Sequence, residues 1–129
     1  AALYHDASEI LTGDLPTPIK YDNPDIQGAY KSVETMAEQK LLSMLPEEFR
    51  PTYREILTIP DPEVRALVKA ADKLSAYIKC VEELKAGNSE FRDAAAQTRA
   101  ALEEYELPEV TYFLETFMPS FSLTLDQLK

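Results

Sequence analysis

The chain has 129 residues, of which 45% are hydrophobic, and a formal net charge of −10. This composition favours one folded domain with a core over a disordered chain, and no apolar run approaches the ~18 residues of a membrane span. Binding to nucleic acid phosphates needs a basic surface, so we expect no nucleic acid polymer as partner. Because no apolar run is long enough to span a membrane, we expect no membrane partner either.

Nearly the whole chain is predicted to be helical, because apolar residues recur at helical spacing and most prolines stand where helices begin or end. We therefore predict a single all-α domain over residues 1–129, a bundle of about six helices. Cys80 is the only cysteine, which fits a reducing compartment, and we expect the protein in the cytoplasm. The predicted helices cover residues 1–11, 24–44, 46–57, 62–86, 89–105 and 108–118, with a last turn at 123–128.

The first predicted helix carries the residue types best suited to chemistry. At about 100° per residue, His5, Asp6 and Glu9 share one face of it. An imidazole beside carboxylates suits a divalent transition metal and proton transfer, although a plain surface helix is the simpler alternative. Asp14 follows Gly13, which ends the helix. The first residues, Ala-Ala-Leu-Tyr, are typical of a helix interior and lack an initiator methionine, so we expect an N-terminal portion to be missing.

The second predicted helix begins at Pro24 with Asn23 as its N-cap, and the short third helix is interrupted by Pro51. The apolar residues of the second helix are expected to form one buried face. That face contains Ile26, Tyr30, Val33, Met36, Ala37, Leu41 and Met44.

The helix over residues 62–86 is predicted to be central, with Asp61 as its cap and Gly87 at its end. Apolar residues cover more than half of its circumference, so other helices are expected to enclose it. Asp72 lies at the edge of this apolar face, where a carboxylate is costly unless it is paired or binds a metal. Lys69 and Lys79 are candidate partners, so an ion pair and a metal ligand both stay open.

Two segments, YHDASEILTGDLPTPIKY and LVKAADKLSAYIKCVEELKAGNSEF, resemble the HD-domain phosphohydrolases, and among these most closely the bacterial 5′-deoxynucleotidases. The resemblance extends to TYFLETFMPSFSLTLDQL and so covers nearly the whole chain. It implies that the all-α domain is an HD-domain helical bundle.

The resemblance implies a divalent metal held by His5, Asp6 and Asp72, which match the HD pair and the final Asp of the family's metal ligands. Glu9 and Asp14 match acidic residues that the family uses in catalysis. Family members remove the phosphate from deoxyribonucleoside 5′-monophosphates, prefer cobalt with manganese or copper as substitutes, and form homodimers. Asp14, and Lys20 after the LPTP loop, are the candidate substrate-binding residues.

One departure from the family pattern concerns the first metal-binding histidine and an Arg-Trp pair that contacts the phosphate. Both lie upstream of the HD helix, whereas His5 is the only histidine here and tryptophan is absent. We expect these elements in the missing N-terminal portion. The alternatives are a hydrolase of another phosphate ester, such as a cyclic nucleotide or an alarmone, and a non-catalytic helical interaction module.

Overall fold

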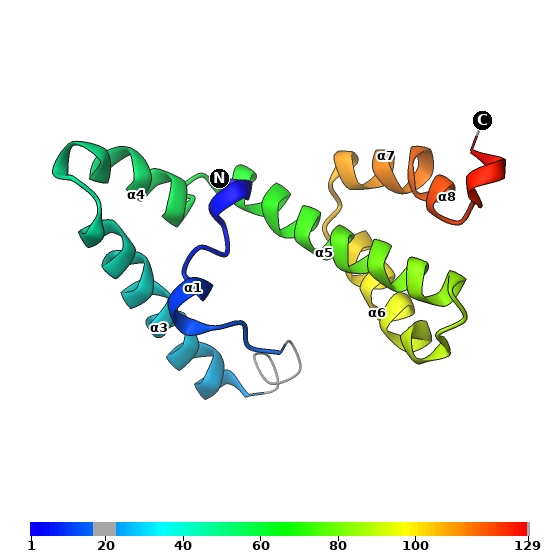
Figure 1. Cartoon of the computed structure of the whole chain (residues 1–129), viewed down its shortest axis with the longest axis horizontal. Coiled ribbons are helices and arrows are strands. Elements are labelled where there is room, and N and C mark those ends of the chain that lie inside the picture. The colour runs from blue at the N-terminus through cyan, green and yellow to red at the C-terminus, as the bar shows by residue number, and fades with distance from the viewer. Residues whose placement is uncertain (17–22, 129) are drawn as a thin grey trace. The chain divides into compact units, whose positions relative to one another are not determined.

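The computed structural model describes residues 1–16 and 23–128, and every regular element in these ranges is a helix (Figure 1). The prediction of an all-α fold is therefore confirmed for the described part of the chain. No helix in these ranges has the length and apolar character needed to cross a bilayer. The chain divides into two compact units, Ala1–Val64 and Arg65–Lys129. That both belong to one HD domain stays a prediction.

The first unit is built around the long helix α3, which contacts α1 and α4 (Figure 1). The Asn23 side chain caps α3 by accepting a 2.8 Å hydrogen bond from the Asp25 amide, as predicted. Among the described residues of this unit, four hydrophobic side chains are buried, Ala37 and Leu42 on α3 and Leu57 and Ile59 at the end of α4, and Ser8 is a buried polar residue. The elements are η1 (Ala2–Tyr4), α1 (Glu9–Thr12), α3 (Pro24–Met44), η2 (Glu47–Phe49) and α4 (Arg50–Thr58).

The predicted continuous helix over residues 1–11 is wrong. Residues 2–4 form the 3₁₀ helix η1, turns follow, and α-helical bonding begins only at Glu9. An α-helix would direct the Asp6 amide to the Ala2 carbonyl, but this carbonyl already accepts from the His5 amide and faces the His5 ring. Bonds of the tighter i→i+3 type therefore replace the α-helical ones through this segment.

Two other expectations for the first unit are corrected. The apolar face predicted for α3 is largely exposed, because burial concentrates at Ala37 and the unpredicted Leu42 while Met36 and Met44 are 69% and 61% exposed. Pro51 does not interrupt a helix but occupies the first turn of α4, where its missing N–H has no helical partner to lose.

The second unit contains most of α5, whose boundaries agree with the prediction. Asp61 Oδ1 accepts hydrogen bonds from the Glu63 and Val64 amides at 2.9 and 3.3 Å, and Gly87 has a positive φ of 91° beyond the helix end. The elements are α5 (Pro62–Lys85), η3 (Ser89–Phe91), α6 (Arg92–Glu103), α7 (Pro108–Thr116), α8 (Met118–Phe121) and η4 (Leu125–Gln127).

The core of the second unit is centred on Leu102 of α6, which is fully buried. Side chains of α5, α7 and α8 complete it, namely Ala70, Val110, Leu114 and Met118. On α5 the stripe that faces this core runs from Ala70 to Val81, and the more N-terminal Leu67 is 39% exposed. The predicted enclosure of α5 is confirmed at the buried residues Val68, Ala70 and Cys80 and is wrong at Leu67.

Candidate metal centre

His5 has a defined ring orientation. Its Nδ1 lies 2.8 Å from the Ala2 carbonyl oxygen, and because a carbonyl oxygen only accepts, Nδ1 carries a proton. The opposite nitrogen, Nε2, is then the atom available to a metal ion. A backbone carbonyl that fixes the tautomer in this way is typical of histidine metal ligands.

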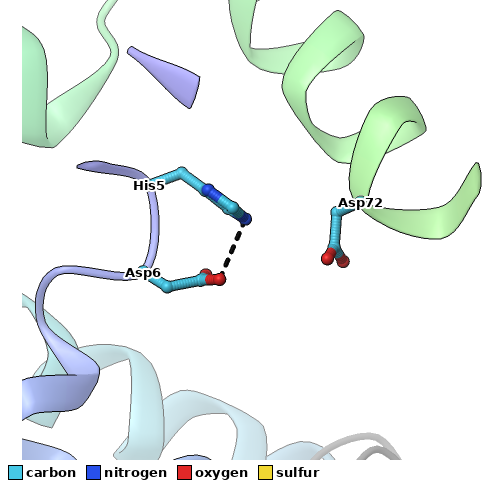
Figure 2. A group of neighbouring side chains, drawn as sticks. All are labelled: His5, Asp6 and Asp72. Atoms are coloured by element: carbon cyan, nitrogen blue, oxygen red, sulfur yellow. Dashed lines mark ion pairs between the residues drawn. The ribbon is translucent and has the colours of Figure 1, made fainter. Parts of the chain in front are cut away.

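Asp6 follows directly and places its Oδ2 3.0 Å from His5 Nε2, the pair marked by the dashed line in Figure 2. The two side chains are 32% and 56% exposed, so solvent ions reach them. In the neutral ring, Nε2 and Oδ2 are both acceptors and need a cation or a proton between them. Two ligand atoms at about 2.1 Å from one metal ion, at right angles to each other, are about 3.0 Å apart. The pair therefore fits a divalent metal.

The segment that carries this pair is attached to α4 just before His5. The Tyr4 and Tyr53 rings meet edge to face, with centroids 5.9 Å apart and an interplanar angle of 79°. A hydrogen bond with Tyr53 raises the pKa of Tyr4. This contact limits how far residue 4, and with it His5, can move relative to α4.

Glu9 and Asp14, the two candidate catalytic carboxylates, stand at the two ends of α1. Glu9 is the first residue of α1 and is half-buried, and its amide donates to the Asp6 carbonyl at 2.9 Å. Asp14 is exposed and follows Gly13, whose φ of 71° and ψ of 163° turn the chain out of the helix. The same short segment thus carries both carboxylates and the His5-Asp6 pair.

Two further candidate residues belong to other segments of the chain. Asp72, also labelled in Figure 2, is an exposed residue of α5 in the second unit. Of the two lysines considered as its partners, Lys79 forms an ion pair with Glu83 one turn further along α5. A metal site shared by His5, Asp6 and Asp72 stays a prediction. Lys20 lies outside the described residues.

Sequence reasoning missed the hydroxyl group of Tyr30. Tyr30 lies on the apolar face predicted for α3, but its hydroxyl donates a 2.8 Å hydrogen bond to the carbonyl of Gly13, immediately before Asp14. The α3 periodicity locates the ring on one face and carries no signal for this bond, which joins residues 17 positions apart. The first unit therefore attaches the candidate segment on both sides, at Tyr4 and at Gly13.

Comparison with known proteins identifies the family of the chain. Residues 1–121 match the family model described as 5′-deoxynucleotidase YfbR-like. The chain is 54% identical to a 5′-deoxynucleotidase of Vibrio cholerae, 53% to one of Yersinia pestis and 51% to one of Shewanella oneidensis. Each similarity covers 98% of this chain and 66% of the relative, so the chain spans just under two thirds of those proteins.

The matched residues include the whole candidate segment and Asp72. A family model that covers all but the last eight residues, together with relatives of this identity, identifies the family. The chain therefore belongs to the YfbR-like 5′-deoxynucleotidase family.

Proposed function

We propose that the protein is a metal-dependent 5′-deoxynucleotidase, which converts a deoxyribonucleoside 5′-monophosphate and water into a deoxyribonucleoside and inorganic phosphate. The observation that carries this proposal is the 51–54% identity to proteins named 5′-deoxynucleotidase, over 98% of the chain. The activity is assigned to the intact protein, since those relatives are longer than this chain.

His5 Nε2 and the carboxylates of Asp6 and Asp72 are the proposed metal ligands. The protonated Nδ1 of His5 and the 3.0 Å separation of Nε2 and Asp6 Oδ2 support this set, and imidazole with carboxylates suits manganese, cobalt or copper. A divalent cation held there supplies Lewis acidity, which activates water and stabilises charge on the phosphoryl oxygens.

Glu9 and Asp14 are proposed to act on the water and the sugar. Glu9, one turn after His5, accepts the proton of the attacking water, which approaches phosphorus opposite the leaving 5′-oxygen. Asp14, exposed beyond Gly13, orients the sugar or the water, and Lys20 contributes to substrate binding. The net charge of −10 otherwise repels an anionic substrate, so we expect nucleotide binding to depend on the metal.

Three finer assignments follow from the family resemblance. We propose cobalt as the preferred metal, with manganese or copper as substitutes, a homodimer as the assembly and the cytoplasm as the location. The metal assignment is checked by restoring activity to the metal-free protein with each divalent ion in turn, and the assembly by light scattering.

The test of the proposed function is a substrate panel assayed with the intact protein and cobalt. Phosphate release is measured for deoxyribonucleoside 5′-monophosphates, the matching ribonucleotides, deoxyribonucleoside 3′-monophosphates, triphosphates and a cyclic nucleotide. We expect rapid release from the deoxyribonucleoside 5′-monophosphates alone.

Equal rates on deoxyribonucleotides and ribonucleotides would remove the protein from this substrate class. Hydrolysis of the cyclic nucleotide instead would favour another phosphate ester. Binding of a protein partner with no turnover of any compound in the panel would favour the non-catalytic module.

A further inference from the structure

Two side-chain hydroxyl groups meet at the carbonyl oxygen of Gly13. Thr12 Oγ1 donates to it at 2.9 Å and the Tyr30 hydroxyl at 2.8 Å, and the two hydroxyl oxygens are 3.5 Å apart. Thr12 belongs to the same segment as Gly13, whereas Tyr30 lies on α3, 17 residues further along the chain. Tyr30 therefore ties the end of α1 to a different helix.

The bonded carbonyl belongs to the peptide group that joins Gly13 to Asp14. The ψ angle of Gly13 sets the direction of this carbonyl, and the same angle sets the position of the Asp14 nitrogen. Gly13 has φ of 71°, a region that glycine enters freely, so its own conformational preferences restrict this rotation little. The hydrogen bond from the Tyr30 hydroxyl restricts the ψ rotation of Gly13, which the glycine backbone by itself restricts little.

The Asp14 side chain makes few contacts that would fix its position. It is exposed, and within the described ranges it makes no hydrogen bond or ion pair of its own. Helix α3, by contrast, is 21 residues long, has a side-chain cap and contacts α1. The position of Asp14 therefore depends on α3 through the Gly13 carbonyl.

We propose that Tyr30 is a positioning residue for Asp14, and that its hydroxyl group holds the Gly13–Asp14 peptide in the orientation that the reaction uses. The catalytic part of this inference rests on the proposed function. The alternative is that Tyr30 serves only packing, in which case its ring matters and its hydroxyl does not.

The primary test is Tyr30→Phe in the intact protein, because this change removes the hydroxyl and keeps the ring. We expect kcat on a deoxyribonucleoside 5′-monophosphate to fall about tenfold, the cost of a small misplacement of an active group. Cobalt binding should be unchanged. Tyr112→Phe is the matched control, since Tyr112 is 61% exposed and its hydroxyl has no hydrogen-bond partner in the described part of the chain. Equal activity of Tyr30→Phe and wild type would overturn the proposal.

A double-mutant cycle with Asp14→Ala shows whether Tyr30 acts through Asp14. In the Asp14→Ala background, Tyr30→Phe should change kcat by less than about twofold, because the group that it positions is gone. A further loss of about tenfold would contradict the proposal, because Tyr30 would then act on the reaction by another route.

Backbone ¹⁵N relaxation separates this inference from the proposed function. Absence of phosphate release by the wild-type protein would refute the proposed function alone. The order parameters of Gly13 and Asp14 would still report the effect of the hydrogen bond between the Tyr30 hydroxyl and the Gly13 carbonyl. We expect them to fall below about 0.6 in Tyr30→Phe and to stay at the wild-type value in Tyr112→Phe. Unchanged order parameters in Tyr30→Phe would refute the positioning role whatever the activity.

Discussion

The chemistry of the candidate site depends on the orientation of the His5 ring. The Ala2 carbonyl fixes the proton on Nδ1 and directs Nε2 to the Asp6 carboxylate. The same carbonyl would serve the Asp6 amide in an α-helix, so the 3₁₀ geometry of residues 2–4 and the histidine tautomer have a common cause. A local departure from α-helical bonding thus accompanies the ring orientation of His5, the proposed metal ligand.

Asp6 and Glu9 are expected to respond differently to substitution. Asp6→Asn should weaken cobalt binding, because it removes a proposed ligand charge. Glu9→Gln should leave the cobalt dissociation constant within about twofold and lower kcat by about 10² or more, since Glu9 is proposed to take a proton. Calorimetric cobalt titration and phosphate release measure the two effects. Loss of cobalt binding in Glu9→Gln with retention in Asp6→Asn would reverse the two roles.

Glu38 on α3 allows the pH dependence of the stability of the first unit to be tested. Burial, and secondarily the charge of Glu34, raises the pKa of Glu38. A raised pKa in the folded state means that the stability contribution of Glu38 is present at acidic pH and is lost as the pH rises through the folded-state value.

Glu38→Gln should therefore raise Tm at pH 7 and change it little near pH 4. Glu48→Gln, which removes an exposed charge from η2, is the control and should show a smaller difference between the two pH values. Thermal melts followed by circular dichroism at both pH values check this. An equal effect of Glu38→Gln at pH 4 and pH 7 would contradict it.

At the scale of elements, helix boundaries are the features that the sequence predicts best. Asn23 and Asp61 both act as side-chain caps, and Gly87 ends α5, because the chemistry of capping is contained within a few neighbouring residues. The first predicted helix was wrong because a carbonyl engaged by the His5 ring cannot be read from periodicity. The exposed face of α3 was likewise predicted as buried, since an apolar stripe does not say what covers it.

The N-cap of α5 allows the stability contribution of one such helix boundary to be measured. Asp61→Ala should lower the free energy of unfolding by about 1 kcal/mol, because the Glu63 and Val64 amides lose their acceptor. Asp61→Asn keeps an acceptor oxygen and should lose much less. Urea unfolding monitored by circular dichroism compares the two variants. Equal losses would mean that the charge, rather than the hydrogen bonds, stabilises the helix end.

At the scale of the whole molecule, the chain consists of two units that carry different candidate site residues. The first carries His5, Asp6, Glu9 and Asp14, and the second carries Asp72 together with the Leu102 core. Sequence resemblance named the family and the five candidate site residues His5, Asp6, Glu9, Asp14 and Asp72. It carried no information on the Tyr30 hydrogen bond, which depends on how α1 packs on α3.

Stability of the second unit should depend strongly on Leu102. Leu102→Ala deletes a fully buried side chain from the centre of the core and should cost about 2–5 kcal/mol. Leu128→Ala, at a half-exposed position, should cost no more than about 0.5 kcal/mol. Chemical denaturation measures both. A similar loss in the two variants would contradict the described core.

The net charge leads to a prediction about partners. At −10 the protein should not be retained on immobilised DNA at low salt, and its nucleotide binding should vanish when metal is removed. Filter binding with and without a chelator tests both statements. Nucleotide binding that survives complete removal of metal would contradict a metal-centred site.

The central claim is that the HD pair and Asp72 form one metal site that hydrolyses deoxyribonucleoside 5′-monophosphates. The most direct measurement follows phosphate release from such a substrate while cobalt is added to the metal-free intact protein. Wild type and the control Asp126→Asn, which alters an exposed residue of η4, should regain activity. Asp72→Asn should stay more than about a hundredfold below them, because a proposed ligand is lost. Full activity without metal, or recovery of Asp72→Asn to the wild-type level, would contradict the claim.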